Sequence, residues 1–183
     1  MVALETPICD FGWKAPEFEL SGIDNKKYSY SQIRGKNGTL IMFICNHCPY
    51  VKSAIHRIVE DCKILQENDV GIIAIMSNDV EDYPEDSFEN MKKFSEDNSF
   101  SFPYLYDETQ DIGKKYDAVC TPDFFGFNNQ NELQYRGRLE ASQKELVPGA
   151  PKELLEAMLQ IAKTGQGPRN QIPSIGCSIK WKK

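Results

Sequence analysis

Two cysteines lie three positions apart in the segment FICNHCPYVKS, which spans residues 43–53. His47 precedes the second cysteine, Cys48, and a proline follows it. This spacing fits a redox-active dithiol, half of a metal site, or two neighbouring core cysteines. A tight turn would bring Cys45 and Cys48 within bonding distance, as thiol-disulfide exchange requires. His47 is either a proton carrier for that chemistry or a surface histidine on a loop.

Cys48 has the sequence environment of an activated thiol. Residues 39–44 form an apolar run typical of a buried strand, and a helical pattern of apolar positions begins at Val51. Pro49 suits the first position of that helix. Unpaired backbone N–H groups and the helix dipole stabilise a thiolate there, lowering its pKa by roughly one to several units. We therefore predict Cys48 as the nucleophile and Cys45 as the first candidate for the resolving thiol.

The remaining four of the six cysteines carry weaker signals. Cys62 falls on the apolar stripe of the helix and is expected in the core. Cys120 is either a third redox thiol or a small core residue, and both interpretations stay open. Cys177 lies in a tail rich in glycine and proline, where it is either a second resolving thiol or inert. Cys9 is assigned no role.

The elements that would position these thiols follow an α/β order. Alternation and helical periodicity predict an N-terminal hairpin, three β-α units, a second hairpin and a final helix at 150–164. The β-α-β order implies parallel pairing, so the fold class is a mixed sheet flanked by helices. We expect one domain over residues 1–165, with its core at about 12–164. The tail at 166–183, which contains Cys177, is predicted to have no regular element.

The overall composition limits the classes of function that the protein can have. A net charge of −6 leaves no basic stripe for nucleic acid, and 40% apolar with 26% charged residues is typical of a soluble globular protein. The sequence shows neither a signal peptide nor an apolar stretch of membrane-spanning length. These features predict a cytoplasmic monomer or homodimer that uses no cofactor and binds neither nucleic acid nor membrane.

Four segments carry a family resemblance: APEFEL, LIMFICNHCPYVK, VCTPDFFGF and the hairpin ending in YRG. With them, the chain from about Pro16 to Thr164 resembles the redoxin branch of the thioredoxin superfamily, the alkyl hydroperoxide reductase and thiol-specific antioxidant family. CNHCPYVK, CTPDFF and PSIGCSIKWK resemble a bacterial subgroup of thioredoxin-like proteins. The resemblance implies a thioredoxin fold. It also implies a cis peptide bond between Thr121 and Pro122, in a loop that in relatives packs against the reactive sulfur and pairs with an extended substrate.

Two departures from the redoxin pattern bear on activity. The usual partner cysteine lies three residues after the proline-flanked one, where this chain has Val51. Peroxidases of the family place a proline seven residues, and a threonine or serine three residues, before the attacking cysteine. Counted from Cys48 these places hold Ile41 and Cys45, so efficient peroxide reduction is not expected. Counted from Cys45, they hold Gly38 and Met42, which fit no better.

The resulting hypothesis is a thiol-disulfide oxidoreductase acting on protein or small-molecule disulfides and reduced by another thiol. Three other functions remain open: a thiol peroxidase with antioxidant activity, a redox-inactive thioredoxin-like adaptor, and a metal-binding protein. Zinc would need a second cysteine pair, which the chain lacks. The copper-chaperone pattern would place its second cysteine at Lys52, and the other histidine, His56, lies two turns along the helix.

Overall fold

A computed structural model describes residues 2–183. Its strands are β1 (Ala3–Glu5), β2 (Glu19–Gly22), β3 (Lys27–Ser29), β4 (Gly38–Phe43), β5 (Val70–Met76), β6 (Tyr104–Tyr106), β7 (Cys120–Thr121), β8 (Asp123–Phe127), β9 (Leu133–Tyr135) and β10 (Ile175–Ser178). Its helices are α1 (Tyr30–Ile33), α2 (Pro49–Glu67), α3 (Phe88–Asp97), α4 (Asp111–Lys115) and α5 (Glu153–Thr164), with a 3-10 turn at Pro84–Asp86.

A seven-stranded mixed sheet forms the centre of the molecule, in the order β3-β2-β6-β5-β4-β8-β9. Strand β4 pairs in parallel with β5 and antiparallel with β8, so it runs through the middle of the sheet. All six β4 residues are buried, as the apolar run at 39–44 predicts for a strand covered on both faces. The expected mixed sheet flanked by helices is confirmed.

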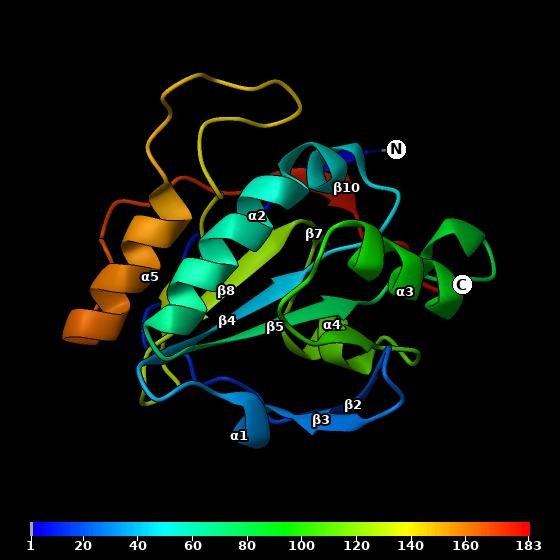
Figure 1. Ribbon diagram of the computed structural model, residues 1–183, viewed down its shortest axis with the longest axis horizontal. Coiled ribbons are helices and arrows are strands. Elements are labelled where there is room, and N and C mark those ends of the chain that lie inside the picture. The colour runs from blue at the N-terminus through cyan, green and yellow to red at the C-terminus, as the bar shows by residue number, and fades with distance from the viewer. Residues whose placement is uncertain (1) are drawn as a thin grey trace.

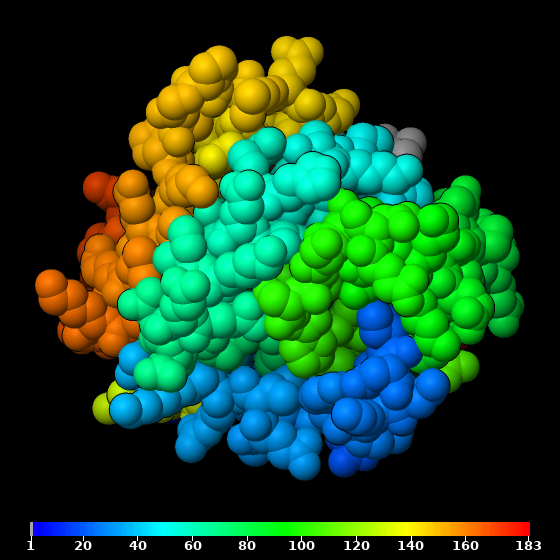
Figure 2. Space-filling view, viewed as in Figure 1, coloured from blue at the N-terminus to red at the C-terminus, as the bar shows by residue number. Residues whose placement is uncertain are grey.

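Helices cover both faces of this sheet. Helices α2, α3 and α5 pack on one face, and α1, α4 and the segment around Trp13 pack on the other. In the space-filling view, α5, α2 and α3 lie in that order across the front of the molecule, above the blue segment that carries β2 and β3 (Figure 2). None of the helices in the described part of the chain is both long and apolar enough to cross a membrane.

Helix α2 follows the predicted apolar period closely. Its inward face buries the residues expected from that period, namely Val51, Ala54, Ile55, Ile58, Val59, Cys62 and Leu65. Pro49 occupies the first helical position and Cys48 is the N-cap. The helix therefore begins a few residues after the carboxyl end of β4 (Figure 1). Cys48 lies at this junction between strand and helix.

The C-terminal tail differs from the prediction. Residues 175–178, expected to have no regular element, form strand β10. This strand lies between β1 and β7 in a separate three-stranded antiparallel sheet. The sequence around β10 is rich in glycine and proline, which disfavour a strand prediction. The segment is nevertheless a strand, because its backbone pairs with two strands that are distant in the chain. The expectation of an irregular tail is wrong at these positions.

Candidate active site: a thiol cluster at the start of helix α2

Cys45 and Cys48 lie on the short loop between β4 and α2, and 1% and 0% of their surface is exposed. Hydrogen bonds fix this loop directly before and directly after Cys45. The Ile44 backbone N–H donates to Ile75 O (3.0 Å), and the Asn46 backbone N–H donates to Asp86 Oδ1 (2.8 Å). The two sulfur atoms are therefore held in place by backbone contacts as well as by packing.

The loop between β7 and β8 supplies the other side of the site. The Thr121–Pro122 peptide bond is cis, which confirms the expectation for this position. Cys48 Sγ lies 3.1 Å from the backbone oxygen of Thr121, and Cys45 Sγ lies 3.4 Å from its hydroxyl oxygen. Both sulfur atoms of the CxxC pair thus contact one residue, 73 and 76 positions away in sequence.

The pKa of Cys48 is lowered to about 5. The largest cause is a hydrogen bond from the Cys45 thiol, and burial opposes it. The Thr121 hydroxyl, the Cys177 thiol and the Val51 backbone N–H lower the pKa further. The helix start contributes through that N–H, as the sequence predicts, but a neighbouring thiol is the main stabiliser of the anion.

The thiols around Cys48 keep their protons. The hydrogen bond to Cys48 raises the pKa of Cys45 well above its ordinary value, and burial adds to the shift. Burial raises the pKa of Cys177 to about 12, helped by its hydrogen bond to Cys48. Burial also raises the pKa of Cys120, whose sulfur contacts Pro122 O at 3.7 Å. Cys48 is therefore the cysteine of this cluster whose surroundings favour the thiolate, whereas those of Cys45, Cys120 and Cys177 favour the thiol.

His47 is not a simple surface histidine. Its Nδ1 lies 2.6 Å from Asp86 Oδ2, and its side chain is 13% exposed against 0% for Asp86. The hydrogen bond to Asp86 raises the pKa of His47, and the ring stacks on Tyr83 at 5.7 Å. The sequence analysis missed Asp86, since a carboxylate 39 positions away in an acidic segment has no signal that separates it from its neighbours.

A buried ion pair holds the proline loop. Arg136 donates from Nη2 to Asp123 Oδ2 (3.0 Å) and from Nε to Asp123 Oδ1 (3.4 Å). Asp123 also accepts a hydrogen bond from the Val119 backbone N–H (3.2 Å), so it closes the loop on both sides of Pro122. Burial raises the pKa of Asp123 to about 6 although Arg136 opposes the shift.

One group in this region has atoms spaced for a metal ion. Ligand atoms of Cys45, His47 and Asp86 all lie within 4.8 Å of one another. However, the Asp86 carboxylate already accepts hydrogen bonds from three donors: the Asn46 backbone N–H, His47 Nδ1 and Asn78 Nδ2. A carboxylate saturated in this way serves to orient its donors, and a tetrahedral zinc site would need a fourth ligand.

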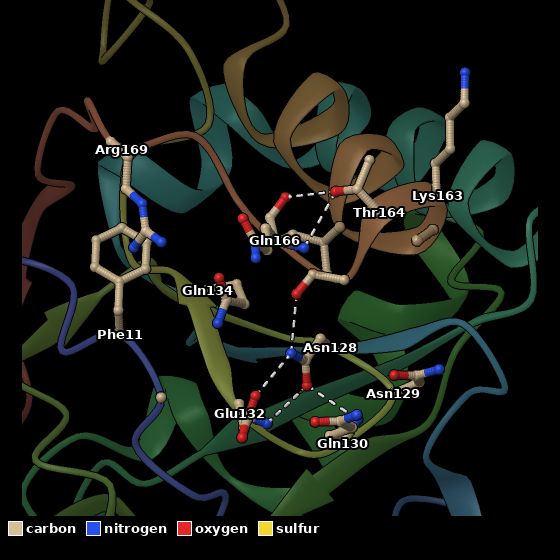
Figure 3. A pocket seen from close by; sticks show the side chains of 14 residues that line it. Phe11, Asn128, Asn129, Gln130, Glu132, Gln134, Lys163, Thr164, Gln166 and Arg169 are labelled. Atoms are coloured by element: carbon tan, nitrogen blue, oxygen red, sulfur yellow. Dashed lines mark hydrogen bonds between the residues drawn. The ribbon is translucent and has the colours of Figure 1, made fainter.

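A surface hollow of about 720 Å³ lies away from the thiols. It opens between the end of α5 and the turn after β8, where Arg169 stacks on Phe11 and Asn128 bonds to Glu132 and Gln130 (Figure 3). Register places this turn at the opposite end of the sheet, because Phe127 pairs with Thr39 at the start of β4. The hollow is therefore separate from the cysteine site.

Comparisons with known proteins agree with this architecture. The AhpC/TSA family profile matches residues 11–137. An uncharacterized conserved protein from Geobacillus kaustophilus is 43% identical, with a TM-score of 0.94 over 100% of this chain and 97% of that one. A hypothetical protein from Sinorhizobium meliloti is 28% identical, with a TM-score of 0.90 and 97% coverage of both chains.

A thiol:disulfide interchange protein of the thioredoxin family from Chlorobium tepidum is 17% identical, with a TM-score of 0.60 over 73% of this chain and 89% of that one. At this identity the likeness concerns the fold, which is thioredoxin-like. Among curated proteins, none matches the sequence.

Proposed function

Because the chain belongs to the AhpC/TSA family, we propose that it is a thiol-disulfide oxidoreductase in which Cys48 is the nucleophile. The observation that carries this proposal is the position of Cys48, which is the N-cap of α2 and contacts the cis-proline loop at 3.1 Å. The sulfur is 0% exposed, yet its pKa is lowered to about 5. Burial alone would favour the neutral thiol. A buried sulfur kept anionic by aimed hydrogen bonds is a feature of reactive cysteines, since the thiolate is the species that attacks disulfides.

The proposed reaction begins when the Cys48 thiolate attacks one sulfur of a substrate disulfide. A Cys48–substrate disulfide forms, the substrate S–S bond breaks, and the departing thiolate takes up a proton. Cys45 is the first candidate to resolve this intermediate, because its thiol already hydrogen-bonds to Cys48. Its attack on the Cys48 sulfur releases the second substrate thiol and leaves a Cys45–Cys48 disulfide, which an external thiol reductant reopens.

Three groups would support these steps without reacting. Thr121 contacts both sulfur atoms, and Pro122 fixes the loop against Cys48. A ring nitrogen of His47 lies within 4.8 Å of Cys45 Sγ, and Asp86 raises the pKa of this histidine, so its positive charge favours the thiolate that Cys45 must form on attack. We propose protein or small-molecule disulfides as the substrates.

A disulfide-reduction assay tests the proposal. We expect Cys48→Ser to reduce insulin or a small aromatic disulfide no faster than the uncatalysed reaction. The matched control is Cys62→Ser, which removes a buried thiol from the same helix outside the cluster and should keep activity. Full activity of Cys48→Ser would reject the assignment. A wild-type chain with no activity and no redox-sensitive pair would instead support the adaptor hypothesis.

Peroxide reduction is the second candidate, favoured by the family match. The place three residues before Cys48, where peroxidases of the family carry a hydroxyl, holds Cys45. The Thr121 hydroxyl, which lies 3.4 Å from Cys45 Sγ and also lowers the pKa of Cys48, comes from a different loop. We therefore expect wild-type protein to turn over hydrogen peroxide much more slowly than a disulfide. Comparable rates for the two oxidants would favour the peroxidase.

A further inference from the structure

Strand β10 occupies the free backbone edge of the proline loop. It pairs antiparallel with β7, and the register sets Cys177 opposite Thr121 and Ser178 opposite Cys120. Thr121 is the residue whose backbone oxygen contacts Cys48 Sγ. Opposite residues of an antiparallel pair have their side chains on the same face, so Cys177 lies on the face of Thr121 that contacts Cys45, and it packs in the same buried cluster as Cys45 and Cys48.

Strand β10 passes so close to this loop that its residue Gly176 has no room for a side chain. A methyl group on Gly176 would collide with the backbone oxygen of Thr121 and would lie 3.1 Å from Pro122 N. Glycine is thus required here by the close passage of two backbones. The strand is fitted to the edge of the proline loop itself, and Cys177 follows directly after this contact.

Cys48 is inaccessible while β10 is in place. None of its surface is exposed, and Cys177, which packs in the same buried cluster, is only 4% exposed. A substrate disulfide must come within bonding distance of the Cys48 sulfur. Any extended chain that paired with Thr121 would need the backbone groups that β10 now uses.

Contacts at both ends hold β10 in place. The Ser174 hydroxyl donates to Pro122 O (2.8 Å), and the Ile179 backbone N–H donates to Val119 O (3.1 Å). On its other side the strand pairs only with β1, whose three residues are all exposed. Because only this short exposed strand covers the outer side of β10, few contacts on that side oppose its separation from β7.

We propose that β10 is an internal substrate strand, which occupies the docking edge of the proline loop and presents Cys177 to Cys48 in the place of a substrate cysteine. The inference rests on the proposed function of Cys48. External disulfides react only when β10 detaches from β7, and its return brings Cys177 back to compete for the Cys48 sulfur. The segment at 174–179 thereby restrains the activity of its own active site.

The chemistry with a small disulfide balances in two exchanges. The Cys48 thiolate attacks oxidised glutathione, a Cys48–glutathione bond forms, and one glutathione leaves as a thiolate and is protonated by water. Cys177 then gives its proton to solvent and attacks the Cys48 sulfur. A Cys48–Cys177 disulfide forms, and the second glutathione leaves as a thiolate and takes up a proton. In the wild type, Cys45 then attacks Cys48 and frees Cys177.

The test is to remove Cys45 and find the partner of Cys48. Cys45→Ser keeps a hydrogen-bond donor beside Cys48 but cannot resolve a disulfide. The full-length variant is incubated with oxidised glutathione, alkylated and digested with trypsin, which separates residues 37–52 from residues 170–180. We expect these two peptides to be joined by a disulfide. The matched control, Cys45→Ser with Cys177→Ser, should retain glutathione on Cys48.

Other outcomes separate the two proposals. A stable Cys48–glutathione adduct beside an alkylated Cys177 in the Cys45→Ser variant would overturn the internal-substrate strand and leave Cys48 as the nucleophile. No adduct and no disulfide at Cys48 in either variant would overturn the proposed function, and the inference with it.

A second variant tests access without changing a cysteine. Gly176→Ala should push β10 away from Thr121 and raise the alkylation rate of Cys48 by about tenfold or more, because the closed strand limits access. Asn129→Ala is the control, since this exposed residue lies in the turn after β8, at the opposite end of the sheet. An unchanged Cys48 rate in a folded Gly176→Ala protein would overturn the proposal that β10 controls access.

Discussion

Helix α2 carries two cysteines that are equally hidden from solvent and differ in ionisation. Cys48 at its start is 0% exposed and Cys62 in its middle is 1% exposed. The pKa of Cys48 is lowered to about 5, whereas burial raises the pKa of Cys62 above its ordinary value. Burial is therefore common to both thiols, and their surroundings account for the difference.

The two surroundings differ in their hydrogen-bond donors. Cys62 lies on the apolar stripe of α2, and the adjacent Asp61 carboxylate further disfavours its thiolate. Cys48 has two neighbouring thiols, a hydroxyl and a helix N–H group aimed at it. The comparison shows that several hydrogen-bond donors around one sulfur can offset the free-energy cost of burying its anion. Bringing these donors together requires segments from different parts of the sequence.

The largest effect is expected from Asp86, which anchors the loop that carries the donors. Asp86→Ala leaves His47, Asn78 and the Asn46 backbone N–H without their buried acceptor. We expect the free energy of unfolding to fall by about 3–5 kcal/mol in chemical denaturation. Asp97→Ala, which breaks an exposed pair with Lys93, is the control and should cost less than about 1 kcal/mol.

The sign of the pH dependence sharpens this prediction. Asp86 raises the pKa of His47 in the folded state. The pair therefore stabilises the folded protein fully at pH values below the ordinary histidine pKa, and this contribution is lost as the pH rises through the raised pKa. The loss caused by Asp86→Ala should accordingly be larger in mildly acidic than in alkaline buffer. A loss that does not change with pH would show that the His47 charge contributes nothing.

Cys45 is expected to have the next largest effect, on ionisation. Its thiol is the main cause of the lowered pKa of Cys48, so Cys45→Ala should raise that pKa by about 2 units. The change is measured from the pH dependence of Cys48 alkylation by mass spectrometry. Cys9→Ala removes a thiol outside the cluster and should leave the midpoint unchanged. The same Cys48 pKa in Cys45→Ala and in the wild type would show that Cys45 does not stabilise the Cys48 thiolate.

The smallest effect on the free energy of unfolding is expected when serine replaces either Cys48 or Cys62. Cys62→Ser places a hydroxyl in apolar surroundings and should lower the free energy of unfolding by about 1–3 kcal/mol. At about pH 4, below the lowered pKa of Cys48, Cys48→Ser should lower it by less than about 1 kcal/mol, because serine can donate to Thr121 O as the protonated thiol does. Equal losses measured by denaturation would indicate that the two environments do not differ.

The parts of this site that were predicted from sequence share a local signal. An apolar strand followed by Cys48, Pro49 and a helical period indicates a thiol at a helix start without reference to the rest of the chain. The same period places Cys62 in the core, and the structure confirms it. The cis bond before Pro122 was expected from the family resemblance, because an X-Pro dipeptide by itself carries no such information.

The parts that were missed depend on contacts between distant segments. Asp86 is one of several acidic residues in its segment, and only the fold selects it as the partner of His47. Strand β10 lacks a β-rich pattern and forms through pairing with β1 and β7. The main stabiliser of the Cys48 thiolate was likewise assigned to the helix start, because the orientation of the Cys45 thiol depends on Thr121 from another strand.

The most direct test of the account is the pKa of Cys48 in the folded wild-type protein. Ultraviolet thiolate absorbance is followed from about pH 4 to about pH 10, and Cys48→Ser identifies the contribution of this sulfur. We predict a midpoint near 5, with Cys62 remaining a thiol over the same range. A Cys48 midpoint at or above about 8.5, the value of a free cysteine, would contradict the account.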